Sequence, residues 1–351
     1  SFASGLPSWI FTLYAGAIAD RIPRRTLLVI TQTAMLVLAF ILAGLTFTNQ
    51  VQPWHIIVMA FLLGIANAFD APARQAFVVE LVDRDAMTNA IAVNSTMFTS
   101  AIVVGPAAGG LAYAAVGPGW CFVLNGISFL AVIAALLMMK LQPVQRIQRK
   151  ATAWGEILDG LKHTWSDKKL LMLISNIGVT TLFGMSVATL IPVWAVDILG
   201  GDARTNGFLL SARGVGSLIG ALLIASMSRR QFRGKMWTIA SFALPVMMVI
   251  FAQVRSIPLA LLVMAGNGWA FISLNNTTNA MVQTQVPDDL RGRVMGIYTL
   301  VFFGSMPLGS LIAGNLADLV GAPTTVTIFA AILMVFAIYL YWRKPEMRQI
   351  G

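Results

Sequence analysis

The sequence has little of what enzymes use for chemistry or for cross-linking. It contains one cysteine, two histidines and 11% charged residues in 351. The lone Cys121 excludes a disulfide within the chain and a thiolate metal cluster. His55 and His163 lie far apart, and neither stands in a metal-ligand spacing. We therefore expect no metal site, no cofactor and no enzymatic activity in this chain.

The phosphate-binding pattern G-x-x-x-x-G-K-[ST] is also absent from the sequence. Its absence argues against an ATP-hydrolysing pump within the chain, although a separate ATPase subunit would leave no trace here. The net charge of +10 would suit nucleic acid only on a soluble fold with a basic face. An apolar fraction of 58% argues against such a fold, so we expect no nucleic-acid partner.

Long apolar runs are what the sequence has instead. Each is about 20 residues long and can cross a hydrocarbon core about 30 Å thick as one α-helix. The chain is therefore predicted to be an all-α membrane protein in contact with the lipid bilayer. The eleven predicted spans are residues 2–19, 26–47, 54–75, 88–115, 120–139, 170–195, 206–227, 236–253, 258–283, 294–318 and 323–342.

The basic residues give these spans a direction. All but three of the 24 Lys and Arg residues fall in one set of alternate loops and span ends. Arg204 and Arg255 lie on the opposite side, and Arg213 lies inside a span. Because cytoplasmic loops are rich in Lys and Arg, we place the first set, and with it the C-terminus, in the cytoplasm of a bacterial-type inner membrane.

One long polar segment divides the chain. It predicts two helical halves, 1–140 and 170–351, joined by a cytoplasmic linker at 141–169. Apolar residues recur at helical intervals within this linker, which predicts an amphipathic helix at the inner interface. They are Trp154, Ile157, Leu158, Leu161 and Trp165.

The two halves repeat each other. A shift of 204 residues superposes several glycines and basic residues, which predicts parallel repeats as in some transporters. The superposed pairs include Gly16 with Gly220, Arg25 with Arg229, Gly105 with Gly309, and Gly110 with Gly314. Because the second half has six predicted spans and the first has five, we expect one further span before Ser1.

A charged loop between the first two predicted spans carries a carboxylate and three arginines. Its pattern is Gly16-x-x-x-Asp20-Arg21-x-x-Arg24-Arg25. With two parallel six-helix halves, the chain resembles the major facilitator superfamily, whose signature loop usually reads G-x-x-x-D-R-x-G-R-R. Pro23 stands where that family has glycine. The resemblance implies a major facilitator fold with eleven of twelve spans present, and an intracellular charge lock at this loop.

Asp70 and Arg74 lie four residues apart and therefore share one helical face near the predicted cytoplasmic end. The resemblance implies that Arg24 pairs with Asp70 and that Asp20 lies near the span that starts at 294. A static ion-pair cluster at the interface would use the same residues, so this alternative stays open.

A second motif lies inside a predicted span. It reads Ala101-x-x-x-Gly105-Pro106-Ala107-Ala108-Gly109-Gly110. It resembles the antiporter motif of the superfamily's drug exporters, G-x-x-x-G-P-x-x-G-G, and the linker is similar to that of the branch with siderophore and macrolide exporters. Small residues permit close helix approach and proline permits a bend, so simple tight packing remains an alternative.

Arg213 and several amides are the candidate cavity residues. Arg213 has apolar neighbours, so its guanidinium needs a partner, water or an anionic ligand. Asp197 and Asp318 are the candidate partners, and an anionic group of a substrate is the other hypothesis. Asn67, Asn94 and Asn276 are the preferred cavity amides, although each can equally form a helix-to-helix hydrogen bond.

The resemblance implies a secondary active transporter that exports hydrophobic or amphiphilic small molecules by alternating access, coupled to proton entry. None of the eleven predicted spans has an acidic residue at its centre. Either Asp70 or a residue of the expected further span would therefore carry the proton. Two alternatives stay open, namely an importer with the same fold and a non-transporting scaffold subunit. The oligomeric state is not predicted.

Overall fold

The computed structural model describes residues 2–7, 10–11, 22–81, 87–139, 164–226 and 233–343. Every regular element in this part of the chain is a helix, as predicted. The chain divides into two compact units. The first comprises residues 1–98 and 112–151, and the second comprises residues 99–111 and 152–351. Most of the predicted linker lies outside the described residues, so its amphipathic helix stays a prediction.

Nine helices in the described ranges are long and apolar enough to cross a membrane. They overlap the predicted spans from 26–47 onwards, and the stretch Thr96–Met138 covers most of two of those spans, 88–115 and 120–139. The predicted span 2–19 lies largely outside the described residues. Many large apolar side chains on these helices are exposed, as expected for surfaces that face lipid.

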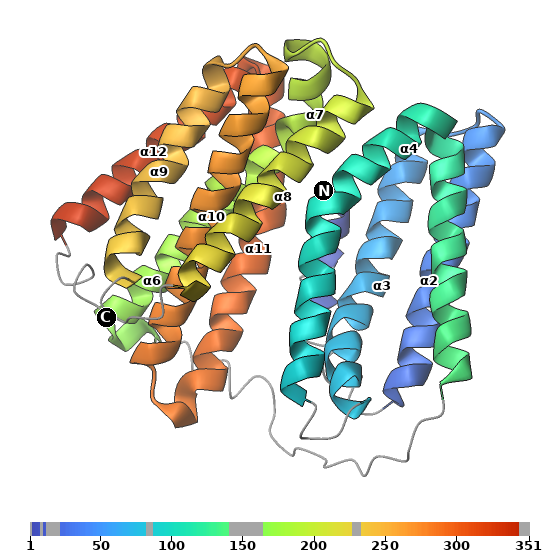
Figure 1. The fold of residues 1–351 in the computed structure, drawn as a ribbon, viewed down its shortest axis with the longest axis horizontal. Helices are drawn as coiled ribbons and strands as arrows, with labels where there is room; N and C mark the ends of the chain where they lie inside the picture. The colour runs from blue at the N-terminus through green and yellow to red at the C-terminus, as the bar shows by residue number, and fades with distance from the viewer. Residues whose placement is uncertain are drawn as a thin grey trace. The chain divides into compact units, whose positions relative to one another are not determined.

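The first unit is built around α2 (Arg24–Phe47) and α3 (Pro53–Glu80), which lie side by side in Figure 1. The C-terminal part of α4 (Met87–Met138) packs on α2 through aromatic rings. Gly117 has φ 80° and ψ 172°, a conformation that interrupts α4 and that glycine adopts without strain. The interruption separates the predicted spans 88–115 and 120–139.

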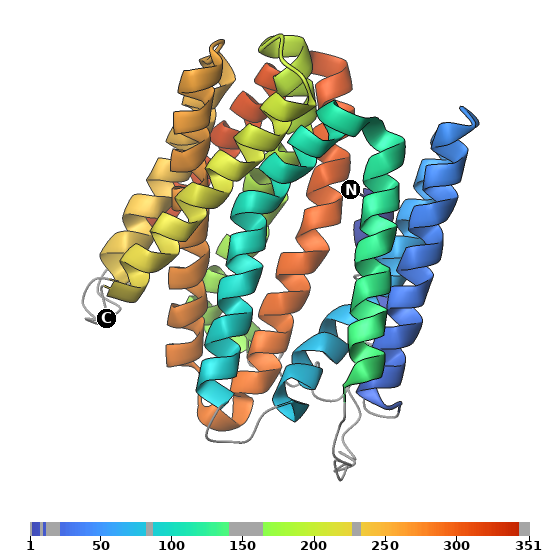
Figure 2. The ribbon, with the colours of Figure 1, turned by 45° about the vertical axis from the view of Figure 1, so that its right-hand side comes forward.

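The second unit contains one continuous apolar core. Its helix α10 packs against α8 and α9, with α6, α11 and α12 completing the bundle (Figure 1). The bounds are α6 (Lys168–Val179), α8 (Ala203–Ser226), α9 (Arg233–Gln253), α10 (Ile257–Gln285), α11 (Asp288–Val320) and α12 (Ala322–Arg343). Residues 99–111 of α4 belong to this unit and run beside α8 in Figure 2.

The span that begins with α6 is not a regular α-helix. It continues as a π-helix at Thr180–Met185, a 3-10 helix at Ser186–Leu190, the short α7 (Ile191–Val193) and a second π-helix at Trp194–Ile198. Pro192 has no N–H for the carbonyl of Ala188, which accepts a hydrogen bond from Ile191 instead. A mid-helix change of winding of this kind often marks a functional or strained segment.

Gly309 of α11 lies directly against this irregular span. A Cβ atom at this position would collide with the Ser186 hydroxyl and the Leu182 carbonyl, whereas Gly314 on the same helix has open space. Gly309→Ala should therefore lower the free energy of unfolding by about 1–3 kcal/mol through overpacking. Gly314→Ala should leave it unchanged or raise it by up to about 1 kcal/mol. Thermal unfolding of both purified variants in detergent measures the difference, and equal stabilities would contradict the close packing.

Candidate functional site

Asp70 is a carboxylate buried between two helices of the first unit. It lies on α3 and is 5% exposed. Its Oδ1 accepts hydrogen bonds from Thr31 Oγ1 at 2.9 Å and from Gln32 Nε2 at 2.8 Å, both on α2. These contacts are the polar link between α2 and α3, where hydrogen bonds across helices are one of the forces that hold membrane helices together.

Arg74 occupies the other oxygen of the same carboxylate. Its Nε and Nη2 atoms donate to Asp70 Oδ2 at 3.0 and 2.7 Å. Four donors thus match the roughly four lone-pair sites of an ionised carboxylate. The prediction that Asp70 and Arg74 share a face is confirmed. The expected pair between Arg24 and Asp70 stays a prediction.

The charged loop is only partly described. Gly16, Asp20 and Arg21 lie outside the described residues, so the lock at this loop stays a prediction. Arg24 is the first residue of α2. Arg25 donates through Nη2 to the carbonyl oxygen of Leu137, near the end of α4. A basic side chain on the last carbonyls of a helix is a favourable cap, so Arg25 ties the start of α2 to the end of α4.

The antiporter-like motif forms a backbone contact between α4 and α8. A Cβ atom on Gly110 would lie 2.6 Å from the carbonyl oxygen of Ala203, and one on Gly207 would collide with the carbonyl of Pro106. A Cβ atom on Gly105 or Gly109 would meet no described atom within 4 Å. The motif therefore divides into a contact face, with Pro106 and Gly110, and a second face on which Gly105 and Gly109 have no neighbour within 4 Å in the described part of the chain.

Pro106 affects two backbone groups at this contact, the carbonyl of Ile102 and the N–H of Ala107. It has no N–H for the carbonyl of Ile102, and this oxygen would lie 2.9 Å from a Cβ atom on Gly214. Such close approach is the setting for weak Cα–H···O bonds between helices. The next N–H, that of Ala107, donates to Ser211 Oγ at 2.9 Å.

The partner stripe on α8 was not singled out from the sequence. It consists of small residues one turn apart, which a search for small-x-x-x-small spacing would find. The stripe is Ala203, Gly207, Ser211 and Gly214. We call it the α8 small-residue stripe.

Arg213 lies next to that stripe, ten residues into α8. At 1.5 Å per residue this is about 15 Å along the helix, near the middle of a bilayer core. Its Cζ atom lies 5.4 Å from the ring centroid of Phe271 on α10. Asp197 and Asp318 are described, and neither is within salt-bridge distance of Arg213, so the expected ion pair is not formed with either.

The amides behave differently from one another. Asn67 and Asn94 are exposed on their helices, and Asn276 is half-buried. Among the described residues, none of these three side chains forms a hydrogen bond, so their role in a cavity stays a prediction. The neighbouring Asn275 instead accepts a hydrogen bond from the Tyr298 hydroxyl at 2.9 Å.

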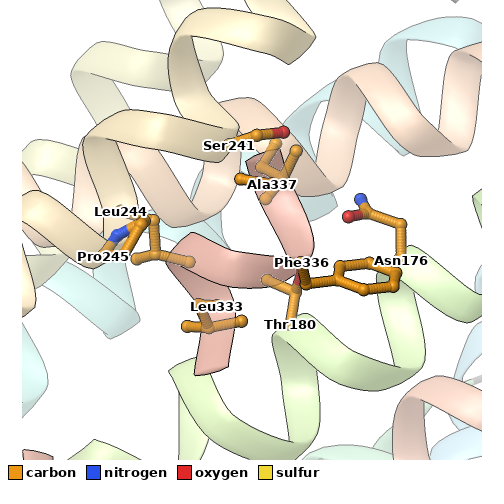
Figure 3. Close-up of a pocket in the computed structure, with 9 residues that line it drawn as sticks. Asn176, Thr180, Ser241, Leu244, Pro245, Leu333, Phe336 and Ala337 are labelled. Carbon is orange, nitrogen blue, oxygen red and sulfur yellow. The ribbon is translucent and has the colours of Figure 1, made fainter. Parts of the chain in front are cut away.

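A small cavity in the second unit lies beside the first π-helix (Figure 3). Its volume is about 10 Å³, close to that of one water molecule. The polar side chains on its wall are Asn176, Thr180 and Ser241, while Leu244, Pro245, Leu274, Leu333, Phe336 and Ala337 supply the apolar wall. It is too small for an organic substrate.

Comparison with known proteins gives a consistent result. A family model described as a transmembrane secretion effector matches residues 1–350. The chain is 30% identical to the multidrug efflux pump Tap of Mycolicibacterium fortuitum, over 100% of this chain and 87% of that protein. It is 26% identical to the staphyloferrin A transporter of Staphylococcus aureus, over 99% and 88%. It is 21% identical to macrolide efflux protein A of Streptococcus pyogenes, over 90% and 79%.

Among solved structures, the chain resembles the crystal structure of the nucleoside transporter NupG. The TM-score is 0.73 at 15% identity, and the likeness covers 97% of this chain and 88% of the other. At this identity the likeness concerns the fold alone.

The Asp70 cluster makes a testable energetic prediction. Arg74→Gln removes a charged donor from a buried carboxylate, which should lower the free energy of unfolding by about 1–3 kcal/mol. Arg74 is 52% exposed, so solvent replaces part of the lost interaction and favours the lower end. The control is Arg204→Gln, whose exposed 3.9 Å contact with Asp202 should contribute almost nothing. Chemical denaturation measures the free energy of unfolding of both variants. Equal losses would contradict a stabilising role for the Arg74–Asp70 pair.

Proposed function

Because the chain belongs to the transmembrane secretion effector family, a branch of the major facilitator superfamily, we propose that it exports hydrophobic or amphiphilic small molecules across the bacterial inner membrane. The predicted transporter of major facilitator fold, without enzymatic activity, is confirmed by the family match and the relatives. Export, proton coupling and orientation are the finer parts of the proposal. The bias of Lys and Arg towards one set of loops supports a cytoplasmic C-terminus.

One structural observation supports a transport cycle, and the relatives support its direction. The antiporter-like motif lies at a backbone contact, where Pro106 and Gly110 of α4 meet the α8 small-residue stripe. Helices packed this closely can lock together in one state and separate in another, because a tight interface has discrete arrangements rather than continuous ones. Two relatives that match nearly the whole chain are named as efflux proteins, which supports the same direction.

Proton coupling is assigned to Asp70. Among the described residues it is the one carboxylate buried inside the protein. Its two oxygens accept hydrogen bonds from Thr31, Gln32 and Arg74, so a movement of Arg74 would change the contacts of this carboxyl group between two states of the transporter. Half-exposed Arg74 is placed to make such a movement.

Inside-out proteoliposomes test the proposed function. With an acidic lumen, the purified protein should move ethidium into the vesicles, and an ionophore that collapses the pH gradient should stop this movement. Ethidium movement only in the opposite direction would favour an importer. No movement of ethidium or of a macrolide under either gradient would favour a scaffold subunit, and either result would contradict export.

Asp70→Asn tests the proton assignment in the same vesicles. The amide keeps the size of the side chain but cannot change its protonation, so flux should no longer respond to the pH gradient. Asp197→Asn is the matched control, since Asp197 is exposed at the end of its span and should leave the response intact. Normal gradient dependence in a folded Asp70→Asn variant would refute the assignment.

Gly110→Val and Gly109→Val test the contact between α4 and α8. Valine at 110 meets the Ala203 carbonyl, whereas valine at 109 meets open space. Overpacking of this kind costs about 1–3 kcal/mol, and 1.4 kcal/mol added to a barrier slows a step about tenfold. We expect initial ethidium flux to fall by about tenfold in Gly110→Val and to change little in Gly109→Val. Equal rates would show that the contact has no part in transport.

A further inference from the structure

Among the described residues, Arg213 has no hydrogen-bond or ion-pair partner, although it lies deep in a span. A guanidinium carries five N–H donors, and none of them bonds to an acceptor among the described residues. We propose that Arg213 and Phe271 form a subsite that binds the carboxylate of an amphiphilic anionic substrate. This inference rests on the proposed transport function and adds a substrate class to it.

Other cations at the spans show how the chain satisfies such groups. Arg74 pairs with Asp70, Arg25 donates to the Leu137 carbonyl, and Arg255 donates to two carbonyl oxygens at 2.9 Å. Arg213 has no such contact in the described part of the chain. Among the described residues, the contact of its guanidinium is the Phe271 ring, 5.4 Å from Cζ to the centroid.

The energetics require another partner for Arg213. A ring face contributes about 0.5–2 kcal/mol to a cation and accepts none of the planar N–H bonds at the guanidinium edge. Exposure of an arginine to hydrocarbon at the bilayer centre costs several kcal/mol, and Arg213 lies about 15 Å into its helix. Arg213 is only partly exposed, and the exposed part of its side chain must therefore face water or a polar ligand rather than lipid.

The surroundings favour a carboxylate over other ligands. Phe271 is buried, so its ring holds the guanidinium from one side and leaves the edge of the planar fork available. That edge matches a carboxylate in two parallel hydrogen bonds. One helical turn along α10, Asn275 adds an amide whose oxygen is held by Tyr298. A single negative charge also loses less hydration in this apolar setting than a doubly charged phosphate would.

The test uses two probes with the same pyrene and chain, one with a charged carboxylate and one with a neutral methyl ester. Binding of 1-pyrenebutyrate and of its methyl ester is measured on the full chain in lipid nanodiscs, with empty nanodiscs subtracted. We expect the wild type to bind the carboxylate at least about tenfold more tightly than the ester, as a bidentate charged pair provides. Arg213→Gln should reduce this ratio to about one while leaving ester binding unchanged.

Two further variants separate recognition from structure. Arg213→Lys keeps the charge but not the planar fork, so it should keep only part of the preference. Arg255→Gln should keep all of it, since Arg255 is satisfied by carbonyl oxygens. A preference that persists in Arg213→Gln overturns the subsite, and so does an equal loss of both probes with a normal thermal unfolding profile.

The outcome for the subsite is distinguishable from that for transport. If the wild type prefers the carboxylate and Arg213→Gln does not, the subsite stands even where ethidium flux is absent. If ethidium flux is normal and neither protein prefers the carboxylate, export stands and the subsite is wrong.

Discussion

Close approach of helix backbones is the constraint on which the second unit depends. Lipid tails are as apolar as leucine, so helices in a bilayer gain little by hiding apolar side chains from them. Contact area and hydrogen bonds must hold the bundle together instead. In this protein α8 meets one neighbour through Gly207 and Gly214 and another, α10, through Gly216 and Gly220. A single helix is thus held on two sides through its own glycines.

The same geometry explains where polar chemistry can occur. Ser211 and Arg213 lie within the stretch of α8 that these contacts hold, and they face different neighbours: Ser211 accepts from Ala107 of α4, and Arg213 lies over Phe271 of α10. A helix fixed on both sides positions its polar groups with little freedom, which suits recognition better than a loosely packed helix does. Ser211 and the Arg213 guanidinium are therefore carried by one rigid helix.

Features that depend on composition were predictable from the sequence, whereas features that depend on distant neighbours were not. The spans follow from hydropathy, and the pairing of Asp70 with Arg74 follows from a four-residue spacing. Thr31 and Gln32 were not predicted as partners of Asp70, because nothing local connects α2 to that position of α3.

The candidate site shows the same division. The motif at Gly105–Gly110 was predicted to allow close helix approach, but the sequence did not say that Pro106 and Gly110 form the contact while Gly105 and Gly109 do not. That distinction requires the position of α8. The change of winding after α6 was likewise not predicted, since Pro192 alone does not indicate which turns become π or 3-10.

The carbonyl of Ile102 has a consequence for how α4 and α8 can come apart. Proline at 106 has no N–H to donate to this oxygen, and the backbone of Gly214 packs closely over the oxygen instead. An unsatisfied carbonyl in a dry interior costs several kcal/mol, so separation of the helices at this point requires a water molecule to hydrate the oxygen. The Ile102 oxygen is therefore free of water while α4 and α8 are packed together and hydrated when they separate. The free energy of hydrating it becomes part of the barrier between these two states.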